Sequence, residues 1–450
     1  MLQSAPPRPP EPRPPLRAVA RGPRPNRDEP WDALLIAVAV FIATAVGRLH
    51  QLFPLVAVFK PVMLAGLVAV ILVVLTPDRR RSLVASWSRS LTWLACFVFW
   101  AMLSIPSSLW PGGSFTLLFD DFIKTALIVV ILVMAVRSRR DVERLAFTYF
   151  LSAAIYAFVA YLRTGGGGGG RVEDFYTYDA NDFAAYAVSA IPLGLHFLRT
   201  KHKPLIRMAA GFGTAFLFLT FMSAQSRGGF LALVACCFAL LFWYRSVRRG
   251  IRVATMSVCT AVFLGLAGPS YLERIESIWV GEKDYNRTSD TGRLEVWKRG
   301  LGYMAARPIT GVGAGMFGTA EGKLSDLAAR QRYGIGVKWS TAHNTYIQTG
   351  AELGVPGVLF YLLFMFGTMR AVARVAKEPS LDPGSDAAMA QAFLASMIAF
   401  TVGAFFLSLA YWPFGYILAA IALGLLKTRG SKPVQGQARP RRTPAYSAVQ

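Results

Sequence analysis

The chain places side chains that could do chemistry at three positions: Arg227, Arg293 and His343. Arg227 stands in a short segment with no other charge, FMSAQSRGGFLALV, and His343 opens a long apolar stretch. A guanidinium stays positively charged at any working pH and forms paired hydrogen bonds to an anion, whereas an imidazole titrates near neutrality. Side chains of these two types can together hold an anion and accept a proton.

The elements that must position these residues are membrane helices. Hydrophobic residues make up 54% of the chain and charged residues only 16%, and apolar runs repeatedly reach the twenty or so residues that a helix needs to cross a bilayer. We predict an all-α, polytopic integral membrane protein with about twelve transmembrane helices. The predicted spans are 32–47, 54–75, 90–108, 115–136, 145–162, 182–198, 205–222, 228–244, 251–268, 344–369, 389–409 and 412–426.

Basic residues in the short loops predict the orientation, because Lys and Arg accumulate on the cytoplasmic side. They cluster after every second span, in 79–89, 137–144, 199–207, 245–252 and 370–377. This alternation places both termini in the cytoplasm and one large loop outside. The predicted organisation is a tail over 1–30, helices one to nine over 31–268, an extracytoplasmic loop over 269–343, helices ten to twelve over 344–427, and a basic cytoplasmic tail over 428–450.

The formal net charge of +23 does not indicate nucleic-acid binding, because much of it lies in these loops and in the two tails. The Pro- and Arg-rich N-terminal tail is expected to be extended and disordered. It either reinforces the topology or binds a partner or anionic lipid headgroups.

Arg227 and Arg293 are unusual for basic residues in this topology. Arg227 lies at the outer surface, against the positive-inside bias, although an arginine near a helix end can also simply extend its charge to the interface. Arg293 begins an amphipathic helix whose apolar residues Leu294, Trp297, Leu301 and Met304 recur at helical spacing. We expect this helix to lie flat on the membrane surface, with Asp290 as its N-cap and Pro308 ending it. A cation in its first turn does not help the helix dipole, which favours a functional role for Arg293.

A polar stripe follows His343 into the next predicted helix. Asn344, Gln348 and Glu352 recur every four residues and therefore share one face. Because polar groups at that depth must face protein or water, we expect the stripe to line a cavity. His343 itself is either part of this site or an interfacial residue at a helix start.

Metal and nucleotide chemistry have less support in the sequence. No CxxC pair or Cys/His cluster occurs, which argues against zinc sites and disulfides. The glycines 165–170 lack the spacing, Lys and Ser/Thr of a phosphate cradle and are expected to form a flexible linker. The stretch GVGAGMFG at 311–318 is expected to be a turn-rich segment that lets the outer loop fold back on the membrane. The cysteines all fall within predicted spans: Cys96, Cys236, Cys237 and Cys259.

Several motifs together resemble the O-antigen ligase and polymerase superfamily. They are SRGGFLAL at 226–233, TGRLEVW at 291–297, RPITGVGAGMFG at 307–318 and AHNTYIQTGAELGVPG at 342–357. DANDFAAY at 179–186 is similar to the family's Asp-Pro-Asn segment, with Ala180 in place of the proline. The similarity covers roughly 175–370 by motif and the whole chain by topology.

The resemblance implies a GT-C-like, metal-independent glycosyltransferase of the bacterial inner membrane, with its site facing the periplasm or exterior. It would move a glycan from an undecaprenyl-diphosphate carrier to a lipid or glycan acceptor, without a cofactor. The family's two arginines and histidine match Arg227, Arg293 and His343. The arginines would bind the diphosphate leaving group and the histidine would deprotonate the acceptor. Asn344 and Gln348, from the polar stripe, are further predicted substrate contacts.

Two questions stay open at the level of sequence. A ligase and a polymerase differ in their acceptor alone, which is lipid A core or protein for a ligase and another lipid-linked glycan for a polymerase. A polysaccharide transporter or flippase is the rival of another class, and it predicts internal repeats and charges at mid-membrane. Neither feature is clear in the sequence.

Overall fold

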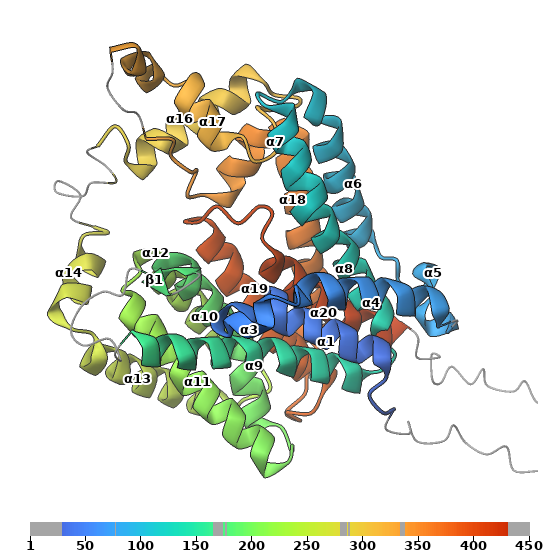
Figure 1. Ribbon diagram of the computed structural model, residues 1–450. Helices are drawn as coiled ribbons and strands as arrows, with labels where there is room; N and C mark the ends of the chain where they lie inside the picture. Colours follow the sequence, from blue (N-terminus) through green and yellow to red (C-terminus); the bar gives the residue numbers. More distant parts are fainter. Residues whose placement is uncertain are drawn as a thin grey trace, which may run out of the picture.

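Helices form nearly all of the regular structure in the computed structural model (Figure 1). The structure describes residues 29–76, 78–164, 174–175, 178–279, 286, 289–333 and 338–430. Within these ranges, the strands are β1 (Asp174–Phe175) and β2 (Tyr178–Asp179), which pair antiparallel. The glycine run 165–170 and most of both predicted tails lie outside the described residues.

Each predicted span coincides with a helix. These helices are α1 (Ala33–Ala45), α4 (Pro61–Leu75), α6 (Arg89–Leu103), α8 (Ile123–Ala135), α9 (Arg139–Arg163), α10 (Ala180–Arg199), α11 (Pro204–Ala224), α12 (Arg227–Trp243), α13 (Arg249–Leu266), α18 (Thr345–Ala376), α19 (Asp386–Ala404) and α20 (Pro413–Gly430). Six helices in the described part of the chain are long and apolar enough to cross a membrane. The all-α membrane class is therefore confirmed, while the count of twelve crossings stays a prediction.

Three spans are less regular than the sequence suggests. The span 54–75 is divided into α3 (Pro54–Ala57) and α4 at Lys60, which has a left-handed φ of 45° just before the proline that begins α4. The π-helical segment η3 (Leu117–Phe122) precedes α8. Helix α18 continues to Ala376 but is broken at Gly354, where φ is 69° and ψ is −170°.

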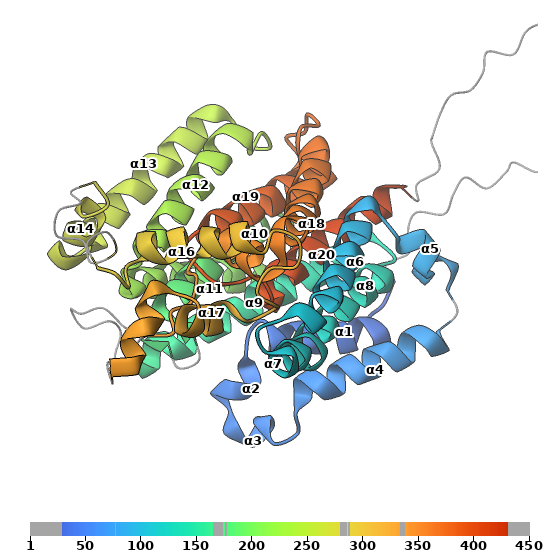
Figure 2. The same cartoon turned by 90° about the horizontal axis from the view of Figure 1, so that it is seen from above.

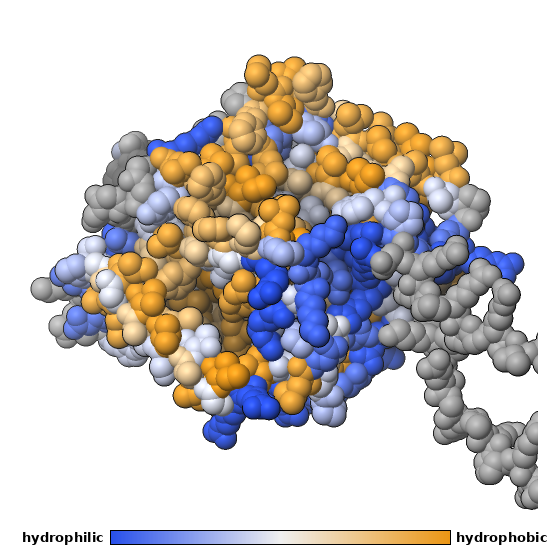
Figure 3. Space-filling model, turned by 90° about the horizontal axis from the view of Figure 1, so that it is seen from below, coloured by the Kyte–Doolittle hydropathy of each residue, from blue (hydrophilic) through white to orange (hydrophobic). Residues whose placement is uncertain are grey.

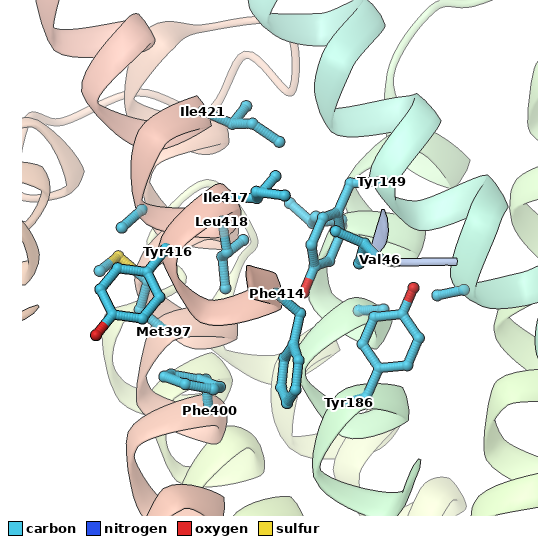
Figure 4. Close-up of a cluster of buried hydrophobic side chains, with 14 of the residues drawn as sticks. Val46, Tyr149, Tyr186, Met397, Phe400, Phe414, Tyr416, Ile417, Leu418 and Ile421 are labelled. Carbon is cyan, nitrogen blue, oxygen red and sulfur yellow. The ribbon is translucent and has the colours of Figure 1, made fainter. Parts of the chain in front are cut away.

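The helices differ in how much of their surface is buried, and the central helices are more buried than those at the edges of the molecule. In α19 the most apolar window is 89% buried, against 6% in α13 and 11% in the segment containing α4. Figure 2 shows α13 and α4 at opposite edges of the molecule, where a lipid environment would cover their apolar surfaces. In the centre, Ile417 and Leu418 of α20 lie near Tyr149, Tyr186 and Phe414 (Figure 4).

Ion pairs gather at the N-terminal ends of α1 and α9, and we call this cluster the basal network. Arg81 lies 2.6 Å from a carboxylate oxygen of Asp32, and Arg137 lies 2.7 Å from the same oxygen. The fully buried carboxylate of Asp141 lies 2.9 Å from Arg137 and 3.0 Å from Arg144. Each arginine is thus neutralised by an adjacent carboxylate. Seen from below, a hydrophilic strip lies beside the hydrophobic surface of the bundle (Figure 3).

Between α13 and α18 the chain forms short helices and turns. They are α14 (Pro269–Glu276), α16 (Arg293–Ala306), α17 (Phe317–Lys323) and the 3-10 segment η6 (Asp326–Tyr333). Helices α16 and α17 lie together beyond the ends of α6 and α18, next to α7 (Pro111–Thr116) (Figure 1). This group carries Arg293 and leads into His343.

Candidate active site

A polar pocket of about 190 Å³ brings Arg227 and Arg293 together. It also contains a third arginine, Arg274, on α14. Neutral polar and glycine residues complete the lining: Asn181, Gln225, Gly228 and Asn286. Three guanidinium groups around a small hollow create a field that attracts an anion.

Arg227 is positioned by a tight junction between two helices. Gln225 adopts a left-handed φ of 45° after α11, and the Ser226 hydroxyl accepts a hydrogen bond from the Gly229 amide at 3.1 Å, which caps α12. The same hydroxyl donates to the Asn181 side-chain oxygen at 2.8 Å. Arg227 is therefore the first residue of α12, and its Nη1 donates to the Ser277 hydroxyl at 3.0 Å.

Gly229 lets this junction form. A Cβ added at Gly229 would lie 2.6 Å from the Ala184 Cβ, closer than real Cβ atoms approach one another. The start of α12 therefore packs directly on α10. This contact brings Arg227 and the first turn of α10, with Asn181, into one pocket.

Arg293 is the first residue of α16, as the sequence predicts, but the predicted cap is wrong. The N-cap is Gly292, which supplies no side-chain hydrogen bond. Asp290 instead lies 3.0 Å from Arg330, and its carbonyl accepts a hydrogen bond from Arg299. Asp290 stands two residues before the cap position, and its contacts stabilise the turn that precedes α16.

The face that α16 buries differs from the predicted apolar stripe. Val296 and Tyr303 are buried, whereas Leu294 and Leu301 are 41% and 48% exposed. The buried face packs against α17 and α18, because Gly300 is small enough to sit against them. Contact between these exposed leucines of α16 and a membrane surface stays a prediction.

His343 directly precedes Asn344, the N-cap of α18, and has a left-handed conformation with φ of 46°. Its amide donates to the Ser408 hydroxyl at 2.9 Å, and its Nε2 lies 3.2 Å from the Thr341 hydroxyl. Burial, and after it the positive charge of Arg293, lowers the pKa of the imidazole to about 4, against an opposing effect of Asp179. His343 is thus neutral near pH 7 and lies within the electrostatic reach of Arg293.

Asn344 and Gln348 face protein groups in the structure. The Asn344 side-chain oxygen caps α18 by accepting from the amides of Tyr346 and Ile347, at 3.0 and 3.1 Å. The Gln348 side-chain oxygen accepts from the Ala410 amide at 3.3 Å. Neither residue lines the arginine pocket, and their contact with a substrate stays a prediction.

Sequence reasoning missed Arg274 and Asn181 as pocket residues. Arg274 carried a usable signal, because it is another arginine on the predicted outer side, where basic residues are disfavoured. Asn181 lies within DANDFAAY, where Asp179 caps α10 by accepting from the amides of Asn181 and Asp182, at 2.5 and 3.3 Å. Among the described residues, no three His, Cys, Asp or Glu side chains gather in a way that could hold a metal ion.

Comparison with known families bears on this pocket directly. A family model described as O-antigen ligase matches residues 212–362. This segment is similar to the O-antigen ligase family. The O-antigen ligase segment contains Arg227, Arg274, Arg293 and His343, and it confirms the resemblance seen in the motifs. The match supports a relation to the O-antigen ligase and polymerase superfamily of membrane glycosyltransferases.

A second model, for a family of unknown function, matches residues 33–202 and contains Asn181. The arginine pocket therefore joins the O-antigen ligase segment to this other segment. No curated protein matches the chain.

Proposed function

We propose that this protein transfers a glycan from an undecaprenyl-diphosphate carrier to an acceptor on the outer face of the bacterial inner membrane. The observation that carries the proposal is the pocket in which Arg227, Arg274 and Arg293 surround a hollow, close to a neutral histidine. Twelve membrane crossings, cytoplasmic termini and an outward-facing site belong to the same proposal. So does catalysis without a metal or cofactor.

The arginines would stabilise the leaving group. As the acceptor oxygen bonds to the anomeric carbon, the bond between that carbon and the carrier diphosphate breaks, and negative charge grows on the diphosphate. Guanidinium groups that are already in place stabilise this charge more in the transition state than in the bound donor. Their positive charge can also replace the divalent cation on which many diphosphate-handling enzymes rely.

His343 would take the proton that the acceptor hydroxyl loses. In the empty site its low pKa keeps the imidazole unprotonated at neutral pH but makes it a weak base. A bound diphosphate would offset the positive charge of Arg293 and so raise the pKa of His343. The base would therefore gain strength when the donor arrives, which couples donor binding to acceptor activation.

A ligase-like reaction is our first choice, and a polymerase of the same superfamily is the alternative. The two share donor chemistry and differ in the acceptor. A flippase is the proposal of another class, in which the pocket binds the diphosphate during translocation without breaking a bond.

Reconstitution in liposomes tests these alternatives. The full-length protein is given a labelled lipid-linked glycan donor with either lipid A core or unlabelled lipid-linked glycan as acceptor, in the presence of EDTA. We expect label to move to one acceptor with release of undecaprenyl diphosphate. Label that crosses the bilayer while still attached to its carrier, with no transfer to either acceptor, would contradict the proposal and favour a flippase.

A further inference from the structure

The outer segment 308–317 is bonded to α18 at the point where that helix is broken. The amides of Val312 and Gly313 donate to the carbonyls of Ala351 and Glu352, both at 2.9 Å. The usual helical donor to the Ala351 carbonyl, the Val355 amide, is turned away at the non-helical Gly354, and the donor to the Glu352 carbonyl would be Pro356, which has no N–H. In the reverse direction, the Val355 amide donates to the Pro308 carbonyl at 2.8 Å.

Glycine is required on both sides of this contact. Gly311 has a φ of 66°, and an added Cβ would lie 2.4 Å from the backbone of Glu352. Gly354 has a φ of 69°, and an added Cβ would lie 2.4 Å from the Ile309 carbonyl oxygen. The outer segment and the helix therefore touch backbone to backbone.

The Glu352 carboxylate completes the joint. One of its oxygens accepts from the Gly315 amide at 3.0 Å and from the Tyr411 hydroxyl at 2.8 Å. The other accepts from the Phe317 amide at 3.3 Å and from the Gln348 amide group at 3.5 Å. The side chain is only 1% exposed, so these contacts replace water around a buried acceptor.

A second set of contacts holds the same segment from the other side. The Leu109 amide donates to the Val312 carbonyl at 2.9 Å, and the Ser114 hydroxyl donates to the Ala314 carbonyl at 2.8 Å. Residues 308–317 are thus fixed between the turn before α7 and the break in α18. Segments far apart in the sequence meet here.

The segment 308–317 also supports α16, in addition to the direct packing of α16 on α18. The segment directly follows the C-terminal end of that helix. Its Phe317 ring packs on Gly300 of α16 so closely that a Cβ added at Gly300 would lie 2.9 Å from the ring. Trp297 of α16 also donates to the carbonyl of Ala342, next to His343, at 2.9 Å. Movement of the segment would therefore shift α16, which carries Arg293, relative to His343.

We propose that Glu352 is a positioning residue, whose carboxylate holds residues 311–317 on α18 and thereby keeps Arg293 in register with His343. The proposal rests on the function proposed above and adds to it a residue that touches neither substrate. Without the carboxylate, two buried backbone amides and a buried hydroxyl lose their acceptor. The segment would relax away from α18, and α16 would move with it.

Glu352→Gln keeps the size of the side chain and one acceptor oxygen, but its NH2 group then faces the donors that bonded to the other carboxylate oxygen. We expect kcat to fall about a hundredfold, since a displacement of about 1 Å in a catalytic group has an effect of this size. Tyr411→Phe removes a single hydrogen bond and should have a smaller effect in the same direction. Gln391→Leu is the matched control, because Gln391 is buried and bonded to Ser246 and Ala376, far from this joint along the chain. This control should lower stability and leave kcat per folded molecule unchanged.

An engineered disulfide between the segment 308–317 and α18 tests whether Glu352 acts by positioning or takes part in the reaction itself. Val312→Cys and Ala351→Cys, in a background whose four native cysteines are replaced, would tie the segment to α18 in place of the carboxylate. Activity of the Glu352→Gln variant should return to within about threefold of the matched cysteine-pair protein on oxidation and fall again by about a hundredfold on reduction. A bridge that closes without restoring activity would overturn the positioning role, as would a Glu352→Gln variant with unchanged kcat.

Spin labels make the test independent of catalysis. Labels at the exposed positions Leu301 on α16 and Leu359 on α18 report the distance between the two helices. We expect this distance distribution to broaden in Glu352→Gln and to narrow again when the disulfide forms. An unchanged distribution would refute the positioning role even if the wild-type protein proved not to be a transferase, whereas failure of wild-type transfer alone would refute only the proposed function.

Discussion

Arginines at two places in this molecule do different work. In the basal network, Arg81, Arg137 and Arg144 point at carboxylates of the same chain, at distances between 2.6 and 3.0 Å. In the pocket, Arg227 and Arg293 face a shared hollow, and Arg227 donates to a neutral hydroxyl. The comparison teaches that net positive charge alone does not mark a site. The carboxylates around the first group explain its charge through the fold, and the shared hollow beside the second group is the basis of the proposed ligand site.

The largest expected effect concerns the histidine beside the pocket. His343→Ala should slow transfer by about a hundred- to ten-thousand-fold, as removal of a general base does, while donor binding persists because the arginines hold the diphosphate. Gln348→Leu, one turn into α18, should reduce activity less. Turnover and donor affinity are measured in the reconstituted system. Unchanged turnover would remove the base assignment, and a collapse of donor affinity would move His343 into a binding role.

Replacing a pocket arginine by lysine tests whether the pocket arginines bind the diphosphate. Arg227→Lys or Arg293→Lys should lower kcat/KM about a hundredfold, because lysine keeps the charge and loses the paired hydrogen bonds. Arg330→Lys is the matched control, since Arg330 forms an exposed ion pair with Asp290. Normal polysaccharide formation by both pocket variants would exclude a diphosphate clamp.

Disrupting the basal network should lower the stability of the protein and leave its transfer activity unchanged. Asp141→Asn leaves Arg144 without its buried carboxylate partner, while Arg137 keeps Asp32 and Glu29, and should cost about 1.5–3 kcal/mol of stability. Transfer per folded molecule should be unchanged. Thermal unfolding in detergent and activity corrected for folded protein give the two values. A variant with normal stability and impaired kcat would show that the two groups of arginines are coupled.

The smallest effect is a shift in pH dependence. With the pKa of His343 near 4, kcat/KM should be flat from about pH 5.5 to 8.5 and fall in more acidic solution as the imidazole is protonated. Asp179 raises this pKa and Lys338 lowers it, so Asp179→Asn should move the acidic fall to lower pH and Lys338→Gln to higher pH. Shifts of both variants in the same direction would contradict the electrostatic assignment.

The sequence predicted the parts of this structure that depend on local pattern. Apolar runs located every main helix, and the misplaced charges of Arg227 and Arg293 led to two residues of one pocket. The part it missed depends on contacts between distant segments. The Glu352 carboxylate was placed in a polar stripe facing a cavity, yet it bonds to amides that lie 37 and 35 residues earlier in the chain. Arg274 joined the pocket only through the packing of α14 on α12.

The break in α18 also bears on the order in which the protein is made. The carbonyl groups that accept from Val312 and Gly313 belong to residues synthesised about forty positions later. A nascent chain that ends before Thr345 therefore lacks the partners that residues 308–317 need, although α16 is already complete. Because chains fold progressively as they emerge, the last assembly step of the region between α13 and α18 must await the synthesis of α18. Maturation of the pocket is thus tied to the synthesis of α18.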